Sequence, residues 1–526
     1  MNELHLSQCA LGIEFGSTRI KAVLIGPDHV PLAQGDFTWE NQLVNGVWTY
    51  ALDNVWHGVQ TAYAALAAEV QRNYGRPLTT VGCIGISAMM HGYLAFDSQG
   101  AQLVPFRTWR NTMTGEAARE LTEAFGFPIP QRWSIAHLYQ AMLDQEEHLP
   151  QLAFLTTLAG YVHWQLTGQK LLGVGDASGM FPIDSTTGRY DAAMLEKFNA
   201  MAADRGYLID LSTLLPTVLS AGADAGALTE KGARLLDPTG TLKPGVPFCP
   251  PEGDAGTGMV ATNSVTPRTG NVSAGTSIFA MIVLEKPLTT IHPEIDLVTT
   301  PDGKAVAMVH CNNCTSDLNA WVALLAQSAV LCGTAVDNGE LFNRLFRLSL
   351  EGAPDGGGIV PVNYISGEGV THFDAGLPLL LRQADRALPL ADFMRANIYA
   401  AFATLSIGLD ILKQENVSVD TLLGHGGLFR TQGVAQRYLA AAAGVPVTCM
   451  ETAGEGGPYG IALLAAYRLH RTKDETLPDY LKHRVFSSAV HTTEQPDPTD
   501  AAGFAVFLQR FKKALAAERA AVEASE

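Results

Sequence analysis

The chain has few cysteines, fewer basic than acidic residues, and no long apolar run. Its seven cysteines are scattered and odd in number, which favours reduced thiols over a disulfide framework. No uninterrupted apolar stretch approaches the roughly 20 residues of a membrane-spanning helix. The segment from Met1 to Gln8 shows no positively charged start followed by an apolar core, so we expect no secretory signal. Together these absences predict a cytoplasmic protein without a membrane partner.

Positive charge is also scarce. Lysine and arginine number 35 against 52 aspartates and glutamates, which gives a formal net charge of −17. Extended binding to nucleic acid needs a basic face, so we expect no nucleic-acid partner. An anionic nucleotide is not excluded, because backbone N–H groups and a divalent metal can supply local positive potential. The length of 526 residues and the 47% hydrophobic content predict a globular protein with two large lobes.

Each half of the chain contains a strand, a glycine turn and a returning strand. Residues 9–18 form the first strand and turn, and residues 19–25 form its returning strand. A third short strand is predicted at residues 31–37. Residues 269–283 repeat the same pattern. Two such hairpins favour duplicated lobes that face each other, although a chance similarity of two glycine turns is an open alternative.

The hydrophobic period then changes to that of helices. Apolar residues three and four apart from Trp56 to Val70 predict a core-facing helix with Asp53 as its N-cap. Residues 81–87 are a continuous apolar strand of the kind covered on both faces, and its end delivers His91 into a loop where ligands gather. Later helices are predicted at residues 396–412, 432–443 and 459–469, with a final amphipathic helix around residues 504–515.

Asp254 stands among glycines, roughly twenty residues before the second glycine turn at residues 273–277. A sugar hydroxyl attacks phosphorus poorly until something accepts its proton. A carboxylate on a glycine turn beside a phosphate cradle is therefore what a small-molecule kinase needs. The alternative is a turn aspartate that bonds its own backbone, which is common next to glycine.

An ordered set of short motifs runs through the chain, although each glycine turn alone is weak evidence. The motifs are Gly12-Ile-Glu-Phe-Gly-Ser-Thr18, Met89-Met-His-Gly92, Trp109-Arg-Asn111, Gly175-Asp-Ala-Ser-Gly179, Gly253-Asp-Ala255, Ser273-Ala-Gly-Thr-Ser277 and Gly424-His-Gly-Gly427. In this order and spacing they make the chain resemble the FGGY carbohydrate kinases, and among these the xylulokinase-type members. The likeness runs from about Leu11 to about Tyr467. The family shares its superfamily with actin and the heat-shock chaperone ATPases.

The resemblance implies an α/β fold of two actin-like (ribonuclease H-like) lobes, each a mixed sheet flanked by helices, with a cleft between them. It implies a sugar-binding and phosphate-binding lobe at residues 1–262, a nucleotide-binding lobe at residues 263–480 and a helical extension at residues 481–526. The implied reaction transfers the γ-phosphate of ATP, with Mg²⁺, to a hydroxyl of a small sugar or polyol. A ketopentose resembling xylulose is the first choice of substrate, and a homodimer is the expected assembly.

The resemblance also implies roles for individual residues. Asp254 is the expected general base. The residues expected to contact the substrate are Met90, His91, Gly92, Trp109, Asn111 and Asp254. The residues expected to bind ATP are Gly16, Ser17, Thr18, Lys21, Gly275, Thr276, Ser277, Gly426 and Gly427. Magnesium is expected at Glu14, through water, and at Asp254.

The chain departs from the family pattern at several of these motifs. Glu14 stands where the family normally has Asp, so the metal or its water shell must shift by about one methylene. Asn111 also replaces an Asp, which exchanges a negative acceptor for an NH₂ donor and puts the identity of the sugar in doubt. His137 and Gln140 replace Lys and Trp. His425 interrupts the small residues of the adenosine turn, where it could stack on adenine or face solvent.

Two other functions remain open on the sequence. One is an ATP-hydrolysing conformational module of the same superfamily, which would not need the sugar-side motifs. The other is a degenerate kinase that senses a sugar. Cys311 and Cys314 have zinc-knuckle spacing but no second pair at a matching distance, and no hydrolase triad emerges. Asp176 is interpreted as a structural cap.

Overall fold

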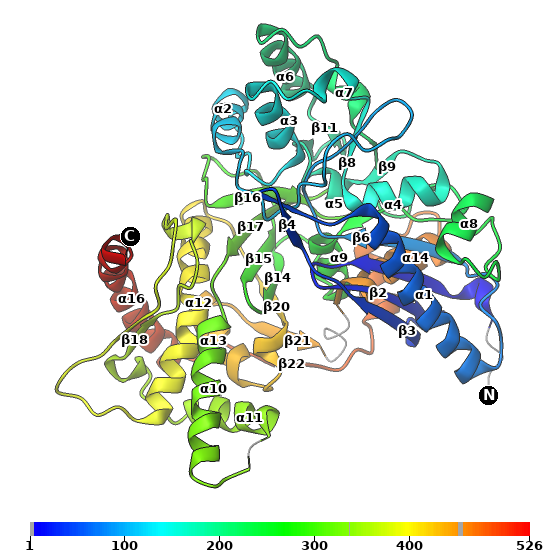
Figure 1. Cartoon of the computed structure of the whole chain (residues 1–526). Coiled ribbons are helices and arrows are strands. Elements are labelled where there is room, and N and C mark those ends of the chain that lie inside the picture. The colour runs from blue at the N-terminus through cyan, green and yellow to red at the C-terminus, as the bar shows by residue number, and fades with distance from the viewer. Residues whose placement is uncertain (1–4, 336, 451–455, 526) are drawn as a thin grey trace. The chain divides into compact units, whose positions relative to one another are not determined.

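The computed structural model describes residues 5–335, 337–450 and 456–525, which fall into two compact units (Figure 1). The first unit takes its described residues from within 1–265, 297–306 and 455–488. The second unit takes its described residues from within 266–296, 307–454 and 489–526. The first unit is therefore completed by two segments that come much later in the sequence.

A five-stranded mixed sheet forms the centre of the first unit, in the order β13-β6-β1-β2-β3. Its strands are β1 (Ala10–Phe15), β2 (Arg19–Ile25), β3 (Pro31–Thr38), β6 (Cys83–Ala88) and β13 (Glu252–Gly253). The first three strands are antiparallel neighbours, whereas β6 runs parallel to β1 and to β13. The carboxyl ends of β1, β6 and β13 therefore meet at one edge of the sheet, where ligands gather in such folds.

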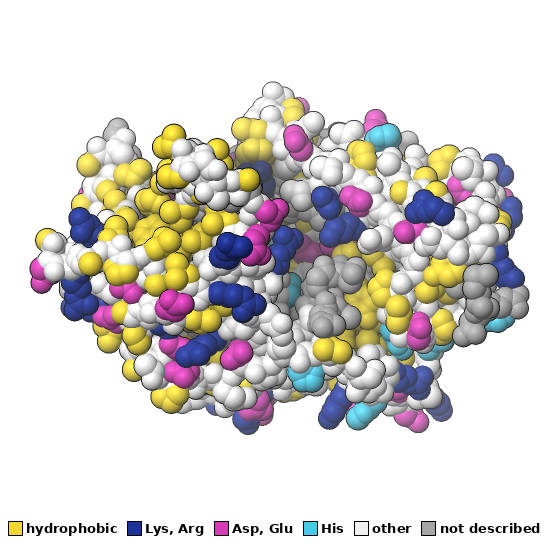
Figure 2. All heavy atoms as spheres, turned by 90° about the horizontal axis from the view of Figure 1, so that it is seen from below, with side chains coloured by type: hydrophobic (Ala, Val, Ile, Leu, Met, Phe, Trp, Pro, Cys, Tyr) yellow, Lys and Arg dark blue, Asp and Glu magenta, His cyan; other side chains and the backbone are white. Residues whose placement is uncertain are grey.

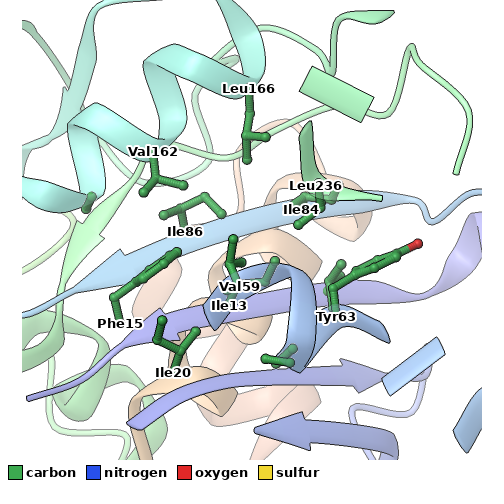
Figure 3. Close-up of a cluster of buried hydrophobic side chains, with 14 of the residues drawn as sticks. Ile13, Phe15, Ile20, Val59, Tyr63, Ile84, Ile86, Val162, Leu166 and Leu236 are labelled. Atoms are coloured by element: carbon green, nitrogen blue, oxygen red, sulfur yellow. The ribbon is translucent and has the colours of Figure 1, made fainter. Parts of the chain in front are cut away.

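The two faces of this sheet differ because side chains alternate along a strand. Ile13 and Ile86 point toward α1 (Leu52–Tyr74) and α4 (Leu158–Thr167) in one buried cluster (Figure 3). On the other face a Cβ at Gly12 would lie 2.2 Å from the Pro458 carbonyl oxygen. A side chain there would therefore push away α14 (Gly456–His470), which packs against β1 and β6.

Helix α1 confirms the predicted period but not the predicted cap. The side chains of Val59, Tyr63 and Val70 are buried as the spacing required. The helix begins at Leu52, so Ala51 occupies the N-cap position and makes no side-chain capping bond. Asp53 lies in the first turn, where its charge still favours the helix dipole, and this is why the sequence alone misplaced the start.

Further helices and strands complete the first unit. Its other helices are α2 (Gly115–Phe125), α3 (Ser134–Leu143), α5 (Val174–Ala177), α6 (Ala192–Asp204), α7 (Leu211–Leu214), α8 (Glu230–Leu236), α9 (Asp254–Ala261) and α15 (Leu477–Tyr480). Its other strands are β4 (Gln42–Val44), β5 (Val47–Thr49), β7 (Leu94–Phe96), β8 (Phe154–Thr156), β9 (Leu171–Gly173), β10 (Ile183–Asp184), β11 (Arg189–Tyr190) and β12 (Thr217–Leu219).

A seven-stranded sheet is the centre of the second unit, in the order β16-β17-β15-β14-β20-β21-β22. Its strands are β14 (Thr269–Ala274), β15 (Ile278–Val283), β16 (Ile295–Thr299), β17 (Ala305–Cys311), β20 (Thr421–His425), β21 (Val447–Met450) and β22 (His491–Glu494). The antiparallel hairpin β14–β15 beside the parallel strand β20 repeats the arrangement of β1–β2 beside β6. The duplicated theme predicted from the sequence is present in the topology.

The second unit also contains five long helices and one short hairpin. They are α10 (Ser316–Leu331), α11 (Asn338–Ser349), α12 (Leu390–Gln414), α13 (Val434–Ala443) and α16 (Pro498–Ser525), with the strands β18 (Val360–Val362) and β19 (Leu379–Leu381). Helix α12 is buried along most of its length, and the stripe of Phe504, Phe507 and Phe511 on α16 is buried as well.

The surface agrees with the composition. On the face that Figure 2 shows, basic and acidic side chains are interspersed, and no broad basic area is visible among the coloured residues. Among the described helices, none combines the length and apolar character that crossing a bilayer would require.

Candidate active site

Asp254 is the first residue of α9 and directly follows β13. Its Oδ1 accepts the Met90 N–H at 3.2 Å and the Ala255 N–H at 2.9 Å. Burial raises the pKa of the Asp254 carboxyl to about 6, and the two N–H donors act in the opposite direction. Both of these bonds use Oδ1, so Oδ2 is the oxygen available to a substrate. The site thus holds a partly exposed carboxylate that can accept a proton near neutral pH.

Glu14 reaches the same edge of the sheet from β1. It lies opposite Lys21 of β2 in the strand register. Its Oε2 is buried and has no hydrogen-bond partner among the described residues. Burial and, to a smaller extent, the charge of Asp254 raise the pKa of Glu14, and Lys21 lowers it. The net pKa is about 8. Two carboxyls that resist ionisation side by side form an electrostatic environment that a cation would relieve.

The length of Glu14 is accommodated by the missing side chain of Gly457. A Cβ built on Gly457, in the first turn of α14, would lie 1.4 Å from Glu14 Oε2 and 2.5 Å from its Cδ. Real Cβ atoms essentially never approach a heavy atom closer than 3.0 Å. Glu14 therefore occupies the space that any other residue at position 457 would need.

His91 lies beyond the end of β6, in a left-handed backbone conformation with φ of 70°. Its Nδ1 is 3.1 Å from the Gly179 carbonyl oxygen, and its ring is parallel to that of Trp133 at 6.3 Å. A carbonyl oxygen can only accept, so Nδ1 carries the hydrogen and Nε2 is the acceptor of the neutral ring. In this tautomer of the neutral ring, the acceptor nitrogen of His91 is Nε2.

In the turn after β1, the carbonyl groups of residues 16–18 accept hydrogen bonds from Trp39 and Tyr50. The Gly16 carbonyl accepts the indole N–H of Trp39 at 2.8 Å, and the Ser17 carbonyl accepts the Tyr50 hydroxyl at 2.6 Å. The Thr18 carbonyl accepts the Trp39 backbone N–H at 3.1 Å. Since C=O and N–H of one trans peptide point in opposite directions, the N–H groups at Ser17 and Thr18 face the other side. Neither has a partner among the described residues.

The turn after β14 has the same construction in the second unit. The Gly275 carbonyl accepts both the N–H and the hydroxyl of Thr315, at 3.2 and 2.7 Å. The Thr276 carbonyl accepts the Cys314 N–H at 3.1 Å. A Cβ at Gly275 would meet no atom within 4 Å, so this side of the turn is open. Successive outward N–H groups of this kind bind anions such as phosphate.

Comparison with known proteins identifies the family of the chain. The model of the N-terminal domain of the FGGY family of carbohydrate kinases matches residues 9–261. The model of the C-terminal domain of the same family matches residues 270–469. The chain belongs to the FGGY family of carbohydrate kinases. Such a kinase transfers the γ-phosphate of ATP, with Mg²⁺, to a sugar hydroxyl. The alternatives of an ATP-hydrolysing module and of a sugar sensor find no support.

Individual relatives are distant. A xylulose kinase of Haemophilus influenzae is 23% identical over 406 residues, which cover 71% of this chain and 76% of the relative. Solved structures of a xylulose kinase from Rhodospirillum rubrum and a gluconate kinase from Lactobacillus acidophilus both give a TM-score of 0.77. They are 19% and 15% identical, and each pairing covers 97% of this chain and 98% of the other. At this identity they show the actin-like two-lobe fold.

The carboxylates of this kinase fit the magnesium ion that its family uses. Glu14 Oε2 is a buried carboxylate oxygen without a partner among the described residues, and the Met90 and Ala255 N–H groups bind Oδ1 of Asp254 rather than Oδ2. Across the described part of the chain, no three His, Cys, Asp or Glu side chains gather as a metal-binding group. Magnesium commonly keeps several waters and is held by one or two carboxylates together with substrate phosphates. Glu14 and Asp254 would hold it in that way.

Met90 and Gly92 lie in the closely packed loop that follows β6. A Cβ at Gly253 would lie 2.1 Å from Cγ of Met90, so the residue before Asp254 must be glycine. Gly92 has a φ of 90°, and a Cβ there would lie 2.7 Å from the Arg107 carbonyl oxygen. Both glycines therefore allow close packing around this loop.

Asn111 is engaged with the backbone of a neighbouring hairpin. Its Oδ1 accepts the Trp48 N–H at 2.9 Å, and its Nδ2 donates to the carbonyls of Trp48 at 2.8 Å and Thr108 at 2.9 Å. The Asn111 NH₂ group, which an aspartate at this position would lack, thus holds the loop to β5. A sugar contact by Asn111 would have to use the second lone pair of Oδ1. Trp109 is partly buried against the apolar core.

Two acids beside Asp254 were not assigned to the site from the sequence. Asp176 accepts the Thr157 hydroxyl at 2.6 Å, while its backbone N–H donates to Glu252 at 2.9 Å. Burial raises the pKa of Asp176, the Thr157 hydroxyl lowers it, and the charge of Asp254 raises it. The net pKa is about 7. Burial also raises the pKa of Glu252 to about 8. The position of Glu252, two residues before Asp254, was the signal that could have found it.

The turn predicted to hold adenosine follows β20. Gly426 has a φ of 101°, and a Cβ there would lie 2.4 Å from the Ala274 carbonyl oxygen. A Cβ at Gly427 would meet nothing within 4 Å. The Nε2 of His425 lies 3.5 Å from Asn271 Nδ2, and burial lowers the pKa of His425 to about 4. His425 is therefore a neutral side chain that contacts β14, and the space beside Gly427 is open.

Proposed function

We propose that this kinase phosphorylates a ketopentose resembling xylulose, with Asp254 as the general base. The observation that carries the assignment of the base is the pair of N–H donors on Asp254 Oδ1. They fix the carboxylate through Oδ1, and Oδ2 would accept the proton of a sugar hydroxyl. Xylulose kinases among the relatives and the neighbouring structures support the choice of sugar.

The first unit would bind the sugar and the second the adenosine. His91 would contact one sugar hydroxyl, and Met90 and Gly92 would form the wall beside it. The turns at residues 16–18 and 275–277 would hold phosphates through N–H groups, aided by the hydroxyls of Ser17, Thr18, Thr276 and Ser277. Lys21 would add positive charge near the first turn. Bound Mg²⁺ would neutralise developing charge on the phosphates.

The experiment is ADP release by the full-length protein with ATP and Mg²⁺ over a panel of sugars. The panel contains xylulose, ribulose, xylose, xylitol, glycerol and gluconate. We expect one ketopentose to give the highest kcat/KM. Asp254→Asn keeps the shape and both backbone bonds, so we expect it to retain nucleotide binding and to lose at least about 100-fold in kcat. Near-normal sugar phosphorylation by this variant would disprove the role of Asp254.

We also propose that the kinase is a cytoplasmic homodimer. The helix α10 offers a surface for self-association, since Leu324, Val330 and Leu331 are 53%, 62% and 87% exposed. Exposed apolar side chains clustered on one helix are typical of protein interfaces. Light scattering after size exclusion would give the mass in solution. A dimer that becomes a monomer with Leu331→Asp supports the proposal, and a wild-type monomer of 56.2 kDa contradicts it.

A further inference from the structure

The turn at residues 275–277 is held by a segment that the sequence singled out for its cysteine spacing. Thr315 bonds the Gly275 carbonyl twice, and Cys314 bonds the Thr276 carbonyl. These contacts fix the two peptide planes whose N–H groups belong to Thr276 and Ser277. Neither N–H has a partner among the described residues. The direction in which they point therefore depends on where residues 314–315 lie.

A buried amide fixes that segment in turn. Asn313 is 2% exposed, and its Oδ1 accepts the Ile365 N–H at 2.9 Å and the Ser366 N–H at 3.2 Å. Its backbone N–H and its Nδ2 donate to Glu368 Oε2 at 3.2 and 3.1 Å. Glu368 is itself 1% exposed. A buried acid costs stability unless hydrogen bonds compensate its lost hydration, and the bonds that Glu368 accepts from Asn313 hold the loop behind the turn.

The Cys314 peptide is held at both ends by the same region. Its N–H donates to Thr276, as above, and its carbonyl accepts the Asn363 Nδ2 at 3.0 Å. The residues between Cys311 and Cys314 therefore stabilise this region through hydrogen bonds that need no metal. Their amides link β17 and the start of α10 to the segment 363–368.

We propose that Thr315 and the Asn313–Glu368 pair are positioning residues, which hold the turn at residues 275–277 so that its N–H groups face the terminal phosphate of the nucleotide. This inference rests on the proposed role of the turn in the kinase. It predicts that the effect of disturbing these residues falls on the triphosphate, since ADP lacks the group that the turn would hold.

The decisive variant is Thr315→Val, which keeps the shape of the side chain and removes the hydroxyl bond to Gly275. Calorimetry on the full-length protein compares a Mg²⁺-bound ATP analogue with a non-transferable terminal phosphate against ADP. We expect Thr315→Val to weaken binding of the analogue by about tenfold, as for the loss of one good hydrogen bond, and to leave ADP binding and the KM for the sugar within about twofold. Thr315→Ser should restore wild-type binding.

A matched control comes from the same loop. Asn312 is exposed and donates to the Gly367 carbonyl at 2.8 Å without touching the turn, so Asn312→Ala should bind both nucleotides as the wild type does. Glu368→Gln keeps an oxygen that can accept from Asn313, so it should also bind both nucleotides as the wild type does. Glu368→Ala removes this acceptor and should weaken binding of the ATP analogue as Thr315→Val does.

Two results would overturn the inference. One is unchanged binding of the analogue by Thr315→Val, and the other is an equal loss for the analogue and ADP, which would indicate general damage. Failure of the proposed function looks different, because the wild type itself would then bind no triphosphate or transfer no phosphate to any sugar of the panel.

Discussion

The contact between Glu14 and Gly457 gives a specific prediction, because there is no room for a side chain at position 457 while Glu14 keeps its position. Gly457→Ala would place a methyl carbon 1.4 Å from Glu14 Oε2. Comfortable contact requires a separation of about 3.5 Å, so the carboxylate must move by roughly 2 Å. That movement would carry Glu14 away from its present position near Asp254. Gly457 lies in a helix and outside the left-handed region, so the substitution itself causes no backbone strain.

The expected magnitude follows from two opposing contributions. Forcing extra volume into a packed site costs about 1–3 kcal/mol. Replacing glycine by alanine in a helix favours folding by up to about 1 kcal/mol, and by less near the end of a helix. We therefore expect Gly457→Ala to lower the free energy of unfolding by about 1–2 kcal/mol in the wild-type background. With Glu14→Ala the clash is gone, so the same substitution should be neutral or stabilising.

Urea denaturation without Mg²⁺ measures this as a double-mutant cycle of Glu14→Ala and Gly457→Ala. A coupling energy of about 1–3 kcal/mol is expected between the two sites. Gly115→Ala is the matched control, because Gly115 opens α2 and its Cβ would have 3.7 Å to the nearest atom. Equal effects of Gly457→Ala in both backgrounds would refute the reasoning. So would a destabilisation by Gly115→Ala as large as that by Gly457→Ala.

Three further predictions concern protons and the first turn. If Asp254 is the base, kcat/KM should rise with pH to a plateau with an apparent pKa near 6, and a flat profile from about pH 5 to 8 speaks against it. Asp176 has a pKa of about 7, above its ordinary value of 3.8, so the folded protein loses stability as pH rises through this window. Asp176→Asn cannot titrate, so its urea midpoint should gain on that of the wild type between about pH 4 and 7 and level off above, and a constant difference across that range would contradict the assignment. Tyr50→Phe removes the bond to the Ser17 carbonyl and should weaken binding of the ATP analogue by about three- to tenfold, with sugar KM as the control.

Most of the individual elements could be predicted from local pattern. The apolar period of α1, the all-buried strand β6 and the glycine stop after α13 each follow from a few neighbouring residues. The ends were less certain, as Asp53 shows, since an acid favours both the cap and the first turn. The sequence also predicts a glycine turn at residues 451–458 before α14, and residues 451–455 of this turn lie outside the described residues. Local chemistry was enough to find the motifs and their order.

What the sequence did not predict depends on distant contacts. Nothing near Gly12 indicates that a helix starting at residue 456 will pack against it, or that Gly457 makes room for Glu14. The engagement of Asn111 likewise depends on Trp48, which lies 63 residues earlier. The sequence did not point to the residues behind the two glycine turns for the same reason, since Tyr50 and Thr315 are remote in sequence from the carbonyls that they bind.

These remote partners explain why the likeness between the two halves is so slight. Each unit binds the carbonyls of its glycine turn from behind and leaves the N–H groups outward. One unit does so with the indole of Trp39 and the hydroxyl of Tyr50, and the other with the backbone and hydroxyl of Thr315. A carbonyl accepts a hydrogen bond from any donor that reaches it, so the donors can differ while the turn keeps its shape. The repeated feature is thus the direction of the peptide groups, which the sequence records only in the small residues of the turns.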